Sequence, residues 1–131
     1  MTHRSQIISI AIARKPAAVY AFASNPKNLT KWAGGLGGSI RRVRGKWVAD
    51  SPMGKVIISF ARENSFGVLD HDVRLESGAT FYNPMRVQSN GTGSEVMFTL
   101  YRLPNVTDKA FRNDARRIRT DLAKLKSILE K

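Results

Sequence analysis

The sequence predicts an α+β protein in which a curved, seven-stranded antiparallel sheet wraps around a long C-terminal helix. Three observations predict this fold class. Apolar residues recur every three or four positions from residue 107 to 131, which is the period of an amphipathic helix. Residues 38–102 alternate apolar and polar side chains between short turns, as antiparallel strands do. A chain of 131 residues is also expected to form one domain, spanning 1–131.

The elements before the sheet are a strand and two short helices. Ile8, Ile10 and Ile12 alternate with small residues, which predicts a half-buried strand. A helix is expected over 16–24, because proline suits the first turn of a helix. An Asn-Pro pair begins a second helix, expected over 25–32.

A glycine-rich stretch, Gly34 to Gly38, ends the second helix. A phosphate-binding role for it is not favoured, because such loops follow a strand and precede a helix, and here the order is reversed. The chain has only two histidines, His3 and His71, and no carboxylates at ligand spacing beside them. The sequence therefore predicts neither a metal site nor a cofactor.

Six strands are expected after the glycines, each bounded by turn residues. They cover residues 38–44, 46–50, 55–62, 67–75, 80–88 and 94–102. Pro84 lies inside the fifth of them and cannot donate a ladder hydrogen bond, so it marks an edge, a bulge or a non-bonded position.

The long helix closes the chain. Thr107 is expected to cap its N-terminus, with Asp108 complementing the helix dipole. One apolar stripe consists of Phe111, Ala115, Ile118, Leu122, Leu125 and Leu129. This stripe needs an apolar surface, and the inner face of the sheet supplies it. Such a helix-grip arrangement leaves space between helix and sheet, because the sheet cannot touch the helix along its whole length.

Two stretches also resemble a known family. "ISIAIARKPAAVYAFASNPKNLTKW" is similar to the opening of START-like (SRPBCC) domains of the polyketide cyclase/dehydrase type, and "RIRTDLAKLKSILEK" resembles their closing helix. The resemblance spans nearly the full chain and contains no catalytic motif. It implies the helix-grip fold and a cavity for a hydrophobic ligand. The functions of its members include lipid carriage, hormone binding, cyclisation and regulation, so the fold does not select one function.

Turn lengths predict which strand residues face one another on the inner side of the sheet. A two-residue turn at Asn64-Ser65, a three-residue loop at 77–79 and a two-residue turn at Gly91-Thr92 set the three registers. The predicted pairs are Phe60–Leu69, Ile58–His71, Leu75–Phe81, Val73–Asn83, His71–Met85, Val87–Val96 and Met85–Phe98. Asn83 is then diagonal to His71, about 7–8 Å away.

His71 is the main candidate for a functional residue. Burial should lower its pKa and keep it neutral at pH 7. A neutral imidazole can act as a general base or anchor a ligand by a hydrogen bond, and Asn83 could orient it or hold an oxyanion. The alternative is that His71 only packs and bonds a local partner. Asp70 and Asp72 point to the opposite face, so no catalytic dyad is predicted.

Several aromatic residues are candidates for the cavity or its lid, or for the core. Trp47 is ambiguous. If it faces inward, a tight turn near Gly45 also turns Arg42 and Arg44 inward, unless a bulge intervenes or Val48 faces inward instead. An arginine at the cavity mouth is a further option. The predicted ligand-binding residues are His71, Asn83, Met85, Phe98, Phe60, Trp32, Phe111 and Trp47, with His71 as the candidate catalytic residue.

The charge and the lack of cysteine bear on partners and location. The formal net charge is +12, with basic clusters at 41–46 and 112–119. These clusters favour an anionic partner, but no nucleic-acid-binding motif accompanies them, so specific nucleic-acid binding is not expected. The absence of cysteine and of long apolar runs fits a cytoplasmic protein with no transmembrane segment. The sequence predicts no oligomeric state.

Three functions follow from these observations. The first is binding of a small hydrophobic ligand, lipid- or polyketide-like, between sheet and helix. The second is a cyclase or dehydratase that uses His71 as acid and base. The third is an interaction protein that uses its basic surface around a closed core.

Overall fold

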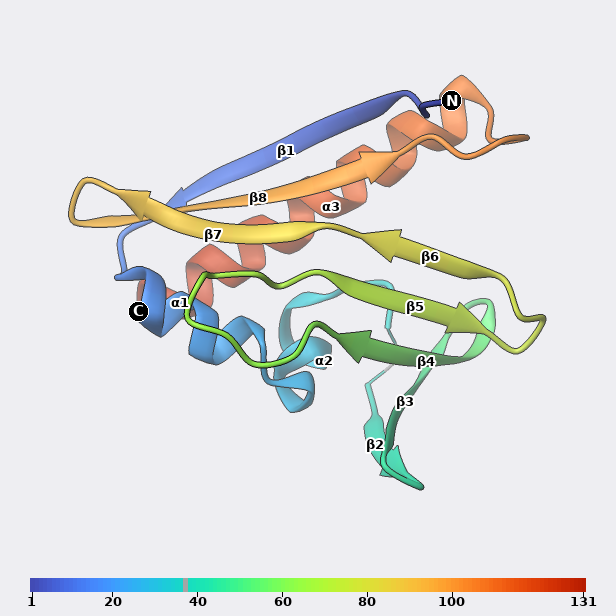
Figure 1. Cartoon of the computed structure of the whole chain (residues 1–131), viewed down its shortest axis with the longest axis horizontal. Coiled ribbons are helices and arrows are strands. Elements are labelled where there is room, and N and C mark those ends of the chain that lie inside the picture. The colour runs from blue at the N-terminus through green and yellow to red at the C-terminus, as the bar shows by residue number, and fades with distance from the viewer. Residues whose placement is uncertain (37) are drawn as a thin grey trace.

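The computed structural model describes residues 1–36 and 38–131 of the chain (Figure 1). It is an α+β protein with antiparallel sheets and a long C-terminal helix. The helical elements are α1 (Pro16–Ala23), the 3₁₀ turn η1 (Pro26–Asn28), α2 (Leu29–Trp32) and α3 (Asp108–Leu129). The strands are β1 (Ser5–Ile12), β2 (Ile40–Val43), β3 (Lys46–Ser51), β4 (Gly54–Phe60), β5 (His71–Leu75), β6 (Thr80–Asn83), β7 (Met85–Asn90) and β8 (Gly93–Tyr101).

The described strands form two sheets, so the prediction of one seven-stranded sheet was wrong. One sheet has the order β1-β8-β7 and the other β2-β3-β4-β5-β6. The predicted strand 80–88 is divided into β6 and β7 at Pro84, which has no N–H to donate to a ladder. The Pro84 carbonyl instead accepts a hydrogen bond of 2.9 Å from the Thr99 N–H on β8.

A short extended segment, 67–69, joins the two sheets. The Leu69 N–H donates to the Met85 carbonyl at 2.8 Å, and the Val87 N–H donates to the Gly67 carbonyl at 2.9 Å. Gly67 has a φ of +73°, and an added Cβ would overlap the Val87 carbonyl oxygen. This position therefore requires glycine.

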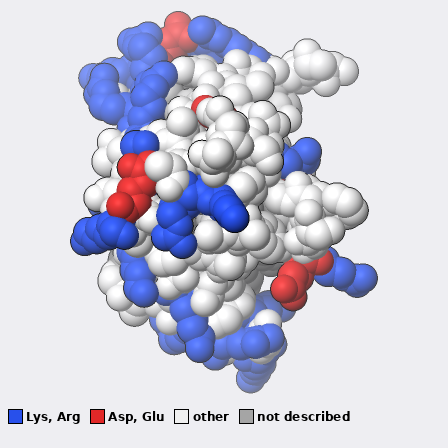
Figure 2. All heavy atoms as spheres, turned by 90° about the vertical axis from the view of Figure 1, so that its left-hand side faces the viewer, with Lys and Arg blue, Asp and Glu red and all other residues white. Residues whose placement is uncertain are grey.

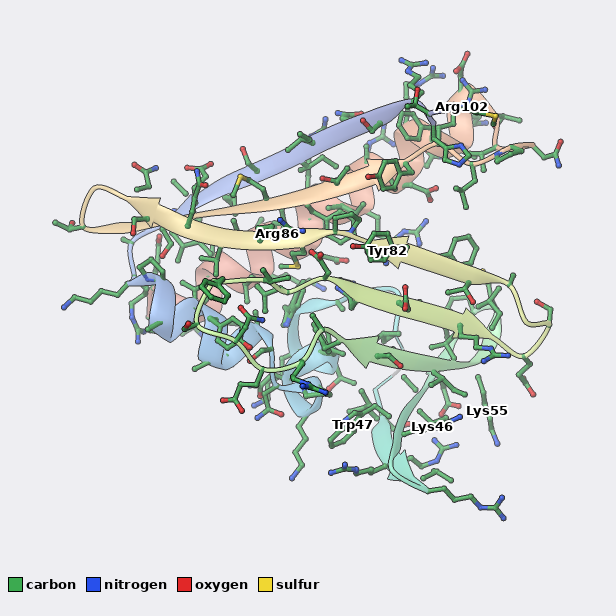
Figure 3. The ribbon with its side chains drawn as sticks, viewed as in Figure 1. Lys46, Trp47, Lys55, Tyr82, Arg86 and Arg102 are labelled. Carbon is green, nitrogen blue, oxygen red and sulfur yellow. The ribbon has the colours of Figure 1, made fainter. Side chains whose placement is uncertain are left out.

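Asp70 stabilises the junction from the outer face. Its carboxylate accepts from the Met85 N–H at 2.8 Å, from Arg86 Nε and Nη2 at 3.1 and 2.8 Å, and from the Tyr82 hydroxyl at 3.0 Å. Figure 3 shows Tyr82 and Arg86 side by side at the break between β6 and β7. The hydrogen bond from Arg86 is the largest cause of a lowered Asp70 pKa, and burial opposes it.

The register prediction was correct for one hairpin and wrong for two. Met85 faces Phe98 across β7 and β8, as the turn at Gly91-Thr92 predicts. However, His71 faces Phe60 on one side and Asn83 on the other, where Ile58 and Met85 were predicted. Both shifts are by two residues, so the same set of side chains still points inward.

The cause of the first shift is the connection between β4 and β5, which is the loop 61–70 and not a two-residue turn. Asn64 holds this loop. Its Oδ1 accepts from the N–H groups of Phe66 and Val68 at 3.0 Å, and its Nδ2 donates to the Val68 carbonyl at 3.0 Å. The Asn64 N–H also donates to the Tyr20 hydroxyl at 3.0 Å, which ties the loop to α1.

The α3 helix packs its predicted stripe against the sheet, chiefly β1 (Figure 1). Five of the six stripe residues are buried, and Ile118 is half-buried. Thr107 caps the helix as predicted, since its Oγ1 accepts from the Ala110 N–H at 3.1 Å. Over residues 1–36 and 38–131, no helix is both long and apolar enough to cross a membrane.

The β2–β3 hairpin projects from the body of the molecule (Figure 1). Its turn residues, Arg44 and Gly45, have φ values of +51° and +80°, so the turn is tight and no bulge is needed. Arg42 therefore pairs with Trp47, and both share a face with Ala49, which is buried. This is the arrangement in which arginine and tryptophan both lie on the inner side of the sheet.

Candidate ligand-binding cavity

A cavity of about 360 Å³ lies between α3, α2 and the inner face of β3 to β6 and β8. Such a volume accommodates a small organic molecule. Most of its wall is apolar. The apolar lining consists of Leu29, Trp32, Ala33, Leu36, Met53, Val56, Ile58, Val73, Phe81, Phe98, Leu100 and Ile118. Alternate residues of each strand supply the sheet side of this wall, as the period of two requires.

His71 is a polar group of the sheet wall and is only 9% exposed. Its Nδ1 lies 3.0 Å from the Leu69 carbonyl oxygen. That oxygen can only accept, so Nδ1 carries the proton and donates. Burial lowers the pKa of His71, and this outweighs the opposing hydrogen bond to Leu69. The imidazole is therefore neutral at pH 7, and Nε2 is a bare acceptor without a hydrogen-bond partner among the described residues.

Aromatic and amide side chains surround this imidazole. The ring centroids of Phe60 and Phe98 lie 5.1 and 6.0 Å from that of His71. Asn83 faces His71 directly across the β5–β6 pair and also lines the cavity. The shifted register thus brings the two polar candidates closer together than the predicted diagonal would.

Trp32 is a second polar group without a partner. The side chain lines the cavity, but its residue is only 4% exposed, and within the described structure the buried Nε1 has no hydrogen-bond acceptor. An unmade hydrogen bond in a buried place costs free energy, so an acceptor that reached Nε1 would be stabilised.

The helix side of the cavity carries polar residues that were not among the predicted ligand-binding residues. Asp114, Arg117 and Asp121 of α3 line it together with Ile118. Arg117 Nη2 lies 2.7 Å from Asp114 Oδ1. Asp121 Oδ1 accepts from the Gly34 N–H at 3.0 Å, and burial raises the Asp121 pKa. The signal was present, because positions 114, 118 and 121 share a helix face beside the apolar stripe.

Gly34 and Gly35 of the glycine-rich stretch lie against this helix. Gly35 lines the cavity, and a Cβ added at Gly34 would come within 3.1 Å of Asp121 Oδ1. Small residues here let the chain approach α3 closely. Gly37, part of the predicted stretch, lies outside the described residues.

Four of the eight predicted ligand-binding residues line the cavity: His71, Asn83, Phe98 and Trp32. The other four lie elsewhere. Met85 is fully buried, and Phe60 contacts the His71 ring. Phe111 is buried with the Arg4 guanidinium 5.6 Å from its ring centroid, and Trp47 has the Arg42 guanidinium at the same distance. Ligand contact by any of the eight stays a prediction.

The remaining chemistry of the described residues is limited. Residues 1–36 and 38–131 contain no group of three His, Cys, Asp or Glu side chains placed to hold a metal ion. Basic side chains are widespread, and Figure 2 shows them distributed over one face of the molecule with few acids among them.

Comparison with known proteins identifies the fold. No protein-family model and no curated protein sequence matches the chain. The solved structure of XoxI from Bacillus cereus matches with a TM-score of 0.72 and 14% identity, covering 95% of this chain and 94% of XoxI. Ara h 8.0201 matches with a TM-score of 0.70 and 12% identity, covering 98% of both chains. DynU16, described as a protein of the dynemicin biosynthetic locus, matches with a TM-score of 0.72 and 11% identity, covering 97% of this chain and 47% of DynU16.

At these identities the matches establish the fold alone. The chain shares the α+β fold of these proteins, with its antiparallel sheets and long C-terminal helix. That fold is consistent with the helix-grip arrangement and with the START-like resemblance.

Proposed function

We propose that the protein binds a small, mostly apolar molecule that carries a hydroxyl group, held between α3 and the sheet. The observation that carries this proposal is the neutral His71, whose Nε2 is an acceptor without a partner among the described residues, in a sheet wall that is mostly apolar. An apolar body would cover the surrounding side chains, and a hydroxyl would donate to Nε2. Asn83, with both donors and an acceptor, would bond the hydroxyl oxygen or a neighbouring carbonyl.

A lipid- or polyketide-like ligand fits this description. Support comes from the START-like resemblance, which implies a hydrophobic-ligand cavity, and from the structural match to a protein of a biosynthetic locus. A cytoplasmic location stays a prediction, and so does membership of the START-like superfamily.

The test is binding of an apolar fluorescent probe, anilinonaphthalene sulfonate, to a variant with a filled cavity. Ile118→Trp would place an indole in the cavity, whereas Ile7→Trp adds the same group at an exposed position and serves as the matched control. We expect the probe to bind the parent and the control, and to lose at least about tenfold in affinity on Ile118→Trp. Equal binding to all three proteins would contradict a cavity site.

Acid–base catalysis by His71 is the second candidate, favoured by the direct pairing of His71 with Asn83. A neutral imidazole beside an amide could remove a proton from a carbonyl substrate while the amide stabilises the oxyanion. If His71→Gln retained the turnover of an identified substrate, this candidate would be excluded, whereas ligand binding would not.

A further inference from the structure

The tip of the β2–β3 hairpin concentrates positive charge. Residues 39–55 have a formal charge of +4. The segment contains one acid, Asp50, and five basic residues: Arg41, Arg42, Arg44, Lys46 and Lys55. Asp50 pairs with Arg41 at 3.7 Å. The hairpin tip comprises residues 41–47, which leaves out Lys55. Within the described structure, the other three basic residues of the tip, at 42, 44 and 46, have no carboxylate partner, and all three are exposed. Their charges are therefore available to a partner.

Apolar side chains accompany these charges. Val43 is 42% exposed at the end of β2, and Trp47 is half-buried at the start of β3. At the other end of β3, Met53 is 60% exposed and also lines the cavity. Figure 3 shows Lys46 and Trp47 on the hairpin that projects from the body of the molecule. In Figure 2 the lower end of the molecule, where Figure 1 places this hairpin, is mostly basic.

We infer that the hairpin tip docks on the surface of an anionic lipid bilayer. A bilayer is the partner that satisfies both features, since its headgroups attract the basic side chains and its interfacial region accepts the exposed apolar side chain of Val43. The alternating strand geometry places charges on both faces of the tip, with Arg41 and Lys46 on one and Arg42 on the other. The tip can therefore approach a charged plane end-on.

Nucleic acid fits these residues less well. Single strands are held by stacking bases on open aromatic faces, but the Arg42 guanidinium lies over the Trp47 ring, 5.6 Å from its centroid. A phosphate backbone also has no apolar surface against which the exposed Val43 side chain could pack. This proposal concerns the outer surface and stands independently of what the cavity binds.

The test is co-sedimentation with extruded vesicles of phosphatidylcholine, with and without phosphatidylserine. We expect the protein to bind the vesicles that contain phosphatidylserine and not those of phosphatidylcholine alone. High salt should dissociate it from the vesicles. The triple variant Arg42→Gln, Arg44→Gln, Lys46→Gln should bind roughly 100-fold more weakly, at about fivefold for each charge removed.

The matched control is Arg112→Gln, Arg116→Gln, Arg119→Gln on the exposed face of α3, which removes the same charge. It should weaken binding by less than about fivefold. A second variant, Val43→Asn, keeps every charge and should still lose a few-fold in affinity, which a purely electrostatic site would not.

Three results would overturn the inference. The first is no binding to anionic vesicles by a folded protein, verified by circular dichroism. The second is an equal loss of binding in the α3 control. The third is binding of a DNA duplex that the hairpin triple variant abolishes while vesicle binding is unchanged.

Discussion

Asp70 and His71 are neighbours in the chain, yet their side chains lie on opposite faces of the sheet and in opposite electrostatic states. Asp70 is charged and its carboxylate accepts four hydrogen bonds, from Met85, Arg86 and Tyr82. His71 is neutral, and among the described residues only Nδ1 of its two ring nitrogens has a hydrogen-bond partner. Polar groups whose hydrogen-bond partners all lie in the chain thus stabilise the fold, whereas a buried polar group with an unused lone pair beside a cavity is available to a ligand.

Removal of the Asp70 carboxylate should change the stability of the protein more than any other substitution considered. Asp70→Ala removes a charged acceptor and leaves the Met85 N–H without its partner, so we expect a loss of about 2–3 kcal/mol in the free energy of unfolding. His71→Phe should change it by no more than about 1 kcal/mol, because a ring of similar shape remains. Urea denaturation measures both.

The control for this pair is Asp72→Ala, which removes a carboxylate from β5 that makes no hydrogen bond in the described structure. Asp72→Ala should change the free energy of unfolding little. If it destabilised the protein as much as Asp70→Ala, the hydrogen-bond network would not be the cause.

The free energy of unfolding should depend on pH in different ranges for His71 and for Asp70. The pKa of His71 is lowered in the folded state, so the unfolded chain binds a proton more readily. Above pH 6.5, the ordinary pKa of histidine, both states are neutral and His71 does not make stability depend on pH. Below pH 6.5 the unfolded chain takes up the proton, so the free energy of unfolding falls by up to about 1.4 kcal/mol per pH unit. The Asp70 pKa is also lowered, so its contribution persists above about pH 4 and is lost only below that.

Denaturation of the parent and of His71→Phe between pH 5 and 7 tests this separation. The parent should lose stability over that range, and the variant should lose much less. Parallel curves for the two proteins would show that His71 is not buried as a neutral group.

The smallest effect is expected on the helix side of the cavity. Asp121→Asn removes a partly desolvated charge and keeps the oxygen that accepts from Gly34. We expect a gain of less than about 1 kcal/mol at pH 7. A thermal melt measures it, and a clear destabilisation would instead show that the Asp121 charge is needed, for example by Arg117 or Lys124.

Local patterns in the sequence predicted most of the fold. The stripe of α3 and the alternation of the strands depend on each segment's own residues, so they could be predicted. The register of β7 and β8 also followed from a local turn. The register of β4 and β5 could not be predicted, because Asn64 folds a longer loop through contacts with Tyr20, which is far away in the chain.

The site was predicted to a similar degree. The alternation of side chains along β5 predicted that His71 faces inward. The register differs from the predicted one by two residues, which leaves His71 on the same face. The polar residues at 114, 117 and 121 were missed because charged side chains on a helix usually face water. Pro84 was noted as an interruption of a strand, but that it divides the strands into two sheets depends on the tertiary contacts of Thr99 and Asp70.

If the free Nε2 of His71 binds the ligand, the protein should distinguish two compounds that differ only in a hydroxyl donor, and calorimetry measures this. 2-Naphthol and its methyl ether share an apolar body, but only the naphthol has a hydroxyl donor. We predict that the parent binds 2-naphthol at least about tenfold more tightly than the ether, and that His71→Phe binds the two equally. Equal affinities in the parent, an unchanged preference in the variant, or binding of neither compound at millimolar concentration would contradict the claim.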